Sequence, residues 1–234
     1  MYATTSMMAS EEILYSIVRS DEEQCATEQL IFREYTKQGY VSEGEKKRKE
    51  LDISKALRSP AATTFVARWH ENIVGTITVF LDSHEGLPLD KVFRSELDAF
   101  RAEGKTIAEV GQFAIDSEAD FPLLACKKKP FLSWPLFNLV FRFVAYKQID
   151  RYCIGIHPKH SPFYSTLFFK DAGDVRSYTS VNDAPVLLKT LRFDTNFYQC
   201  ARFHILLSKF LGGSWSDDVF NVSKKDVCLR FDPT

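Results

Sequence analysis

Several features that would place this chain in a familiar class are missing from its sequence. Its five cysteines, Cys25, Cys126, Cys153, Cys200 and Cys228, are odd in number and show no C-x-x-C spacing. This pattern argues against a disulfide framework and against a zinc knuckle. Thirty Lys and Arg residues stand against 31 Asp and Glu, which gives a formal net charge of -1. The chain therefore has no global electrostatic field that would recruit nucleic acid or an anionic membrane.

Long apolar runs are also scarce. The most apolar stretch, residues 134–146, is interrupted by Arg142. A membrane span needs about 20 apolar residues, so we predict no membrane span. Residues 1–10 lack the basic start and apolar stretch of a secretory signal, and we predict a flexible tail there. With cysteines that show no disulfide pattern, these absences favour a soluble, cytoplasmic protein.

The length and composition favour one large domain. The chain has 234 residues, 45% of them hydrophobic, which is enough to fill a sizeable core. Neither an internal repeat nor a low-complexity linker divides it, so residues 11–234 are predicted to form a single domain. Within it, residues 194–234 are expected to form a C-terminal helix and tail that pack on the body.

Hydrophobic periodicity predicts a mixed order of strands and helices. The predicted strands are residues 13–19, 63–69, 73–81, 107–115, 152–156, 175–181 and 186–193, and the predicted helices are residues 20–38, 89–103, 131–148, 161–169 and 195–211. The charged stretch 43–55 is predicted to be a solvated loop or helix end, because like charges repel. A helix between strands 107–115 and 152–156 predicts that these two strands are parallel. The predicted fold class is α/β (α+β), with a mixed central sheet covered by helices.

One carboxylate, Glu109, interrupts the otherwise apolar strand 107–115. Burial raises the pKa of a carboxyl group, whereas a nearby ammonium lowers it, so such a residue suits holding or deprotonating an amine. An ion pair with an arginine is an equally open interpretation.

The loop and helix that follow this strand indicate an anion site. Lys127, Lys128 and Lys129 come just before the predicted helix 131–148. Unpaired N–H groups and the helix dipole attract phosphate at such a helix start. A solvated lysine run remains an equal alternative.

The segment 157–164 closes a strand and opens a short helix. His157 and His160 are spaced like a metal pair, but no nearby Cys, Asp or Glu completes a ligand set, so we predict no metal site. Tyr164 lies at the predicted helix start, where a phenol is placed to donate a proton to a departing thiolate. An aromatic side chain that simply fills the core is the alternative.

Five segments together resemble the long-chain N-acyl amino acid synthases, which are relatives of the acyl-homoserine lactone synthases in the GNAT superfamily. They are residues 33–40 (REYTKQGY), 73–78 (IVGTIT), 82–88 (DSHEGLP), 108–115 (AEVGQFAI) and 157–169. The resemblance extends over roughly residues 13–191. It implies an N-acyltransferase with a fatty-acyl donor on acyl carrier protein or coenzyme A, an amino acid acceptor and no permanently bound cofactor. It also implies direct attack of the amine on the thioester, within a V-shaped opening between the parallel strands.

The resemblance assigns candidate roles residue by residue. Glu109 falls where the lactone synthases carry a functional glutamate, which makes it the predicted base, and Tyr164 is the predicted proton donor. The remaining candidates are Gly111, Gln112 and Phe113 for the thioester oxygen, Lys127, Lys128, Lys129, Arg142 and Lys147 for phosphopantetheine or carrier docking, and Arg33, Tyr40 and Thr78 for the acceptor.

The chain departs from the relatives at three places. Gln112 and Thr78 stand where the lactone synthases usually have arginine. The R/Q-x-x-G-x-G/A loop that binds pyrophosphate is absent after Ile115, which favours a carrier-protein donor over coenzyme A. Two alternatives remain open: a lactone synthase that uses S-adenosylmethionine, and a non-catalytic protein that only binds an acyl chain or a carrier protein.

Overall fold

A mixed sheet with helices on both faces forms the body of the protein. The computed structural model describes residues 13–119 and 130–192, and the structural statements that follow concern those two ranges. Their strands are β1 (Leu14–Ile17), β2 (Ala62–Trp69), β3 (Asn72–Leu81), β4 (Ile107–Ile115), β5 (Arg151–Ile156), β6 (Lys170–Asp171), β7 (Arg176–Tyr178) and β8 (Ala184–Arg192). Their helices are α1 (Asp21–Lys37), α2 (Lys46–Leu57), α3 (Asp90–Ala102), α5 (Pro130–Tyr146) and α6 (Ser161–Thr166), with short 3-10 turns η1 (Glu43–Glu45), η2 (Pro158–His160) and η3 (Thr179–Val181).

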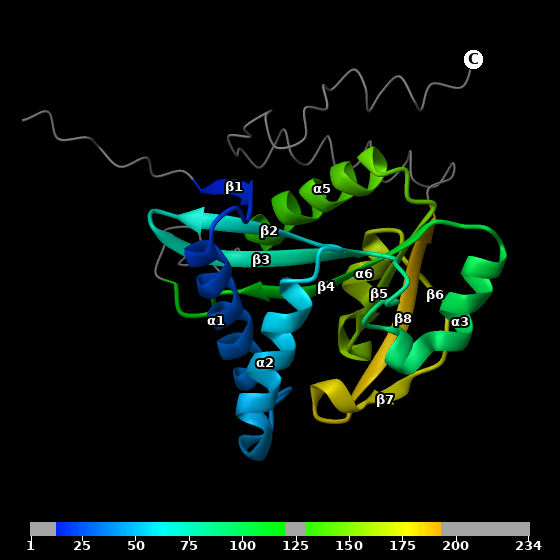
Figure 1. Cartoon of the computed structure of the whole chain (residues 1–234), viewed down its shortest axis with the longest axis horizontal. Coiled ribbons are helices and arrows are strands. Elements are labelled where there is room, and N and C mark those ends of the chain that lie inside the picture. Colours follow the sequence, from blue (N-terminus) through cyan, green and yellow to red (C-terminus); the bar gives the residue numbers. More distant parts are fainter. Residues whose placement is uncertain (1–12, 120–129, 193–234) are drawn as a thin grey trace, which may run out of the picture.

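The strand order is β1-β2-β3-β4-β5-β8-β6, and β7 pairs with β8 beside this path. Neighbouring strands are antiparallel except for β4 and β5, which are parallel and are connected through α5. The predicted mixed sheet and the predicted parallel pair are therefore confirmed. In Figure 1, α5 lies on one side of β2 and β3, and α1 and α2 lie side by side on the other.

Side chains of the strands alternate between these two helical layers. On β2, Val66 packs with Leu30 and Ile31 of α1, whereas the neighbouring Phe65 meets the ring of Phe143 on α5 at 5.7 Å between centroids. On β3, Phe80 packs with residues of α3, opposite to the α5 face. Helices α1, α2 and α3 therefore share one face of the sheet, and α5 covers the other.

Side chains of Ser20 and Glu23 cap the start of α1. The hydroxyl of Ser20 accepts a hydrogen bond from the Glu23 N–H at 3.2 Å. The Glu23 carboxylate in turn accepts from the Arg19 N–H at 2.8 Å, one residue before the position that a capping box uses. Gly39 follows the helix with φ +76, the left-handed conformation expected of a terminating glycine.

Residues 43–55 were predicted to be a solvated loop or helix end, but most of them lie in a helix with one buried face. This stretch forms η1 and most of α2, because Ile53 and Leu57 are buried against α1 and β2. Burial of these two side chains outweighs the repulsion of the lysines. Two smaller differences are the short strand β6, which was not predicted, and residues 179–181, which form η3 rather than the end of a strand.

Some predictions fall on residues outside the described ranges. These are the tail at residues 1–10, the lysine run Lys127, Lys128 and Lys129, and the C-terminal helix and tail at residues 194–234. In the described ranges, none of the helices combines the length and the apolar character that crossing a membrane requires.

Candidate active site

The parallel strands β4 and β5 pair along only part of their length. Their register joins Ile107 with Arg151 and ends with Val110 opposite Ile154. Strand β4 then continues to Ile115. Because neither strand is paired with the other beyond this point, the sheet opens there into a groove.

A bulge in β4 produces this divergence. Thr78 of β3 pairs with Gly111, but Thr76 pairs with Ala114, so Ile77 faces two residues, Gln112 and Phe113. Gln112 adopts φ +51, which is uncommon for a residue with a side chain. An extra residue bends a strand and reverses which face its later side chains occupy.

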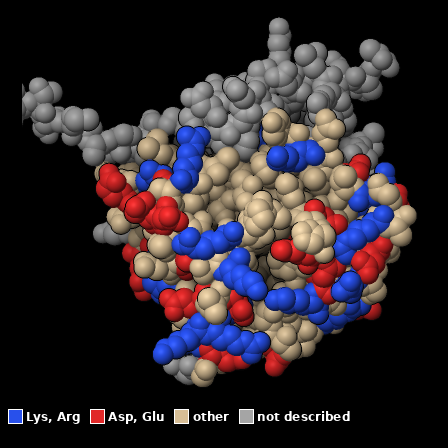
Figure 2. Space-filling model, in the orientation of Figure 1, with Lys and Arg blue, Asp and Glu red and all other residues tan. Residues whose placement is uncertain are grey.

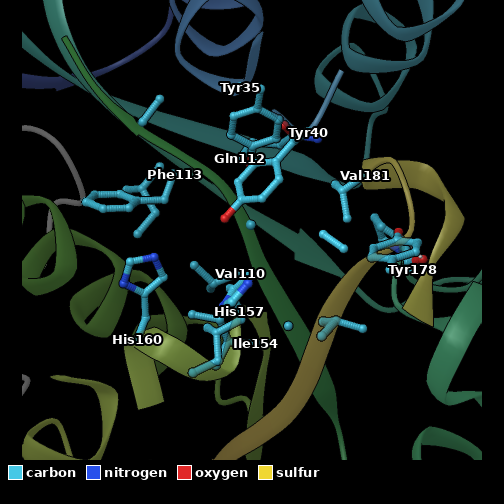
Figure 3. A pocket seen from close by; sticks show the side chains of 18 of the residues that line it. Tyr35, Tyr40, Val110, Gln112, Phe113, Ile154, His157, His160, Tyr178 and Val181 are labelled. Carbon is cyan, nitrogen blue, oxygen red and sulfur yellow. Dashed lines mark hydrogen bonds between the residues drawn. The ribbon is translucent and has the colours of Figure 1, made fainter. Parts of the chain in front are cut away.

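A cavity of about 560 Å³ lies at this opening. It is lined by the end of α1, by α2, β3, the start of α3, β4, α5, the end of β5, α6 and the segment from β7 to β8. Figure 3 shows Tyr35 and Tyr40 on one side of this space, with His157 and His160 opposite them and Phe113 beside them. The volume is in the range of sites that bind small molecules.

Glu109 lies in the wall of the cavity, with 6% of its surface exposed. One carboxylate oxygen, Oε2, accepts a hydrogen bond of 2.7 Å from the Leu89 N–H at the start of α3. Burial raises the pKa of Glu109 to about 8, although this hydrogen bond acts in the opposite direction. A carboxyl group with a pKa near neutrality is suited to exchange a proton with an amine.

Tyr164 also lines the cavity and is 7% exposed. Its ring makes edge contacts with Phe137, Phe163 and Phe169, so packing fixes its orientation. Burial raises the pKa of its phenol, which therefore stays protonated at neutral pH. The structure thus places Tyr164 where a phenol can donate a proton into the cavity.

The predicted oxygen-binding residues and one predicted acceptor residue also line the cavity. Gly111, Gln112 and Phe113 form its β4 wall, and Tyr40 contributes from the loop after α1. The Oε1 atom of Gln112 is buried and has no hydrogen-bond partner among the described residues. A buried amide oxygen without a partner is costly, so a bound ligand that donates a hydrogen bond would satisfy it.

Two predicted acceptor residues lie away from the cavity wall. The Arg33 guanidinium pairs with Asp116 at 2.7 Å on the outer side of α1. Thr78 is fully buried, and its hydroxyl bonds with that of Thr64 at 2.9 Å between β2 and β3. These contacts give both residues a structural role, because each polar group already has a partner within the fold.

The predicted docking residues of α5 lie toward its C-terminal end. Ser133 and Phe137, nearer the start of the helix, line the cavity. Lys147 follows the last residue of the 17-residue helix, about 25 Å from its start. Its ammonium lies 5.6 Å from the Phe143 ring. Arg142 and Lys147 therefore lie farther along the chain of α5 than the two side chains that line the cavity.

A network around Arg101 was not predicted. Its guanidinium forms paired hydrogen bonds with Asp82 and with Asp90, all between 2.7 and 2.8 Å, and a fifth with Asp98. Asp90 Oδ2 also accepts from the Leu87 N–H at 2.6 Å. Through Asp90, Arg101 thus fixes the loop at Leu87, two residues before Leu89, whose N–H donates to Glu109. Only its position three residues after Asp98 was visible in the sequence.

Lys49 on α2 lines the cavity and was also not predicted as a site residue. It precedes the buried Ile53 and Leu57 at intervals of four residues, so all three share one face of the helix. This spacing could have identified it. Metal ligands are not gathered in this region: in residues 13–119 and 130–192, no group of three His, Cys, Asp or Glu side chains is placed to hold a metal ion.

The fold is shared with other solved structures. ElaA from Escherichia coli matches with a TM-score of 0.51 at 10% identity, covering 76% of this chain and 98% of that one. A putative N-acetyltransferase from Lactobacillus plantarum matches with a TM-score of 0.52 at 9% identity, covering 78% and 99%. With its splayed strands and its lined cavity, the protein therefore has the fold of this putative N-acetyltransferase.

A more specific relationship comes from one family. The model of the N-acyl amino acid synthase FeeM matches residues 26–192. The structure of FeeM, an N-acyl amino acid synthase from uncultured soil microbes, matches with a TM-score of 0.69 at 33% identity, covering 82% of this chain and 97% of that one. The chain therefore belongs to the FeeM family of N-acyl amino acid synthases. No curated protein matched the sequence.

Proposed function

We propose that the protein transfers a long-chain fatty acyl group from the thioester of acyl carrier protein to the amine of an amino acid. The observation that supports this most directly is Glu109, a buried carboxyl group whose pKa is about 8, in a cavity at the splay of β4 and β5. Membership in the FeeM family supports the acyl amino acid product.

In this proposal the thioester carbonyl lies against the β4 bulge. Peptide N–H groups at Gln112 and Phe113 stabilise the carbonyl oxygen as it gains negative charge, an effect of about 3 kcal/mol per donor. The bulge supports this role because it turns the backbone of β4 away from β5 at these residues.

The chemical step then moves two protons. Glu109, in its ionised form, removes a proton from the acceptor ammonium, and the free amine attacks the thioester carbon. A C–N bond forms and the C–S bond breaks. Tyr164 protonates the departing thiolate, and the second proton lost by the nitrogen restores the phenol. The products are an N-acyl amino acid and the free carrier thiol.

Aromatic side chains on α5 and α6 are suited to the acyl chain. The rings of Phe113 and Phe137 lie 5.4 Å apart, and Phe163 and Trp134 pack beside them. Each methylene of the acyl chain buried there would contribute about 0.8 kcal/mol. Lys127, Lys128 and Lys129, with Arg142 and Lys147, remain the proposed docking residues for an acidic carrier protein, and this predicts an association rate that falls with salt.

The donor and acceptor are tested together. Purified protein is incubated with palmitoyl carrier protein or palmitoyl coenzyme A, a mixture of amino acids and, separately, S-adenosylmethionine, and the products are identified by mass spectrometry. We expect N-palmitoyl amino acids, with kcat/KM at least tenfold higher for the carrier-protein donor. An acyl-lactone without any acylated amino acid would overturn the proposal, and equal use of both donors would overturn its carrier-protein part.

Tyr164→Phe tests the proton donor. The substitution removes one oxygen and keeps the ring contacts, so we expect kcat to fall about 100-fold while KM and the melting temperature stay unchanged. The matched control is Tyr146→Phe, because Tyr146 is 52% exposed at the end of α5. If both variants turn over like the parent enzyme, the phenol only fills space.

A further inference from the structure

Lys49 brings a positive charge into the wall of the cavity. The side chain is partly buried, and its ammonium donates a hydrogen bond to the backbone carbonyl of Ser180 in η3. Close by, the side-chain amide of Asn182 donates to the Gly39 carbonyl at 3.2 Å. Helix α2, the loop after α1 and the segment between β7 and β8 therefore meet on one side of the cavity, although they are far apart in sequence.

The charges of the other lining residues do not balance this ammonium. Glu34 is already paired with Lys37 at 2.8 Å and with Arg33 at 3.6 Å. Glu109 keeps its proton up to about pH 8 because it is buried. Lys49 itself forms no ion pair with any carboxylate of the described residues, and its hydrogen-bond partner is a neutral carbonyl.

This imbalance favours an anionic group in the cavity. Burial lowers the pKa of Lys49, and the charge of Lys91 lowers it further. The charges of Asp52 and Glu45 offset these effects only in part, so the ammonium has no full counter-charge. A carboxylate would supply that charge, and an ammonium has three donors, so it can bind a carboxylate while it keeps its bond to Ser180. Figure 2 shows lysine and arginine side chains beside the hollow in the middle of this face of the molecule.

We propose that Lys49 binds the carboxylate of the acyl acceptor, so that the enzyme selects α-amino acids over amines that lack a carboxylate. The inference rests on the proposed acyl transfer and adds the residue that recognises the carboxylate of the acceptor. It also replaces the predicted acceptor residues Arg33 and Thr78, whose polar groups are used within the fold. Tyr40, which projects into the same space in Figure 3, is left to contact the remainder of the acceptor.

The test compares acceptors that differ only in the carboxylate. Steady-state kinetics are measured with phenylalanine and phenethylamine, and with leucine and isoamylamine, using one acyl donor throughout. For Lys49→Met we expect KM for the amino acids to rise at least tenfold, with KM for the two amines unchanged. Lys49→Gln can still donate to Ser180, so it separates the loss of charge from the loss of the bond to η3, and it is expected to behave like Lys49→Met.

Lys47→Met is the matched control, since it removes the same charge from an exposed position of the same helix. It is expected to leave both KM values unchanged. Equal losses for amino acids and amines in the Lys49 variants, or no loss for either, would overturn the assignment. A parent enzyme that acylates amines with the same kcat/KM as amino acids would also overturn it but leave acyl transfer intact. A parent enzyme that acylates neither would instead refute the proposed function.

Discussion

Glu109→Gln is expected to lower kcat by a factor of 100 to 10,000, about the contribution of a general base. The amide oxygen of Gln can still accept the hydrogen bond from the Leu89 N–H, so the fold of the site is preserved. In the parent enzyme, kcat/KM should rise with pH through about pH 8, because the base acts when ionised. This limb of the profile should disappear in the variant, whereas ionisation of the acceptor amine remains.

The same substitution should make the protein more stable in alkali. In the folded protein Glu109 keeps its proton up to about pH 8, but in the unfolded chain it ionises near its ordinary pKa of 4.5. Between these values the folded state binds more protons than the unfolded state, so the free energy of unfolding of the parent falls as pH rises. The contribution of Glu109 to this free energy is lowest above pH 8. Gln cannot ionise. Denaturant unfolding at pH 9 should therefore give a free energy of unfolding that is larger for the variant than for the parent, on the order of a few kcal/mol, with no difference near pH 4.

Glu85→Gln is the control for both measurements, because Glu85 is exposed in the loop before α3. It should match the parent in turnover and in stability at each pH. If Glu109→Gln retains both the turnover of the parent and the rise of kcat/KM through about pH 8, Glu109 is not the base.

Arg101→Met is expected to destabilise the fold by about 2 kcal/mol. Removing the guanidinium leaves Asp82 and Asp90 close together without a partner, and both are less than a quarter exposed. Breaking a fully buried pair costs about 3–5 kcal/mol, and the partial exposure of this one reduces the effect. The melting temperature should fall by about 4–8 °C, which calorimetry can measure.

A second readout separates positioning of Glu109 from general stability. The charge of Asp90 raises the pKa of Glu109, and Arg101 offsets that charge in the parent. The rise of kcat/KM with pH should therefore move above pH 8 in Arg101→Met. Arg94→Met is the control on the same helix, because Arg94 is 78% exposed and pairs with Asp98 at 3.5 Å. A loss of stability no larger than that of Arg94→Met would contradict the role of the network.

Elements with strong local patterns were predictable from the sequence. Strand β4 has the predicted bounds, because an apolar run between a glycine turn and an acidic loop leaves little ambiguity. Its parallel pairing with β5 followed from the crossover helix between them. The position of Glu109 inside this strand was enough to predict that it would be buried.

Features that depend on contacts between distant segments were not predictable. The bulge in β4 at Gln112 could not be predicted from the sequence. A positive φ is unusual for glutamine, and a glycine, which adopts it readily, stands one residue earlier. The partners of Arg101 lie up to 19 residues away, and Ser180 is 131 residues from Lys49. Arg33 and Thr78 lie away from the cavity, because their side chains form pairs between elements that a linear pattern does not show.

The extra residue in β4 lets odd-numbered side chains before it and an even-numbered side chain after it face the same layer of helices. Before it, Ile107 and Glu109 face α3, and after it Ala114, an even-numbered residue, packs with α1 on the same side of the sheet. Removing that residue would exchange the inward and outward side chains of the last part of the strand. Among relatives of this enzyme, the number of residues in β4 should therefore vary less than the identity of the side chains it carries.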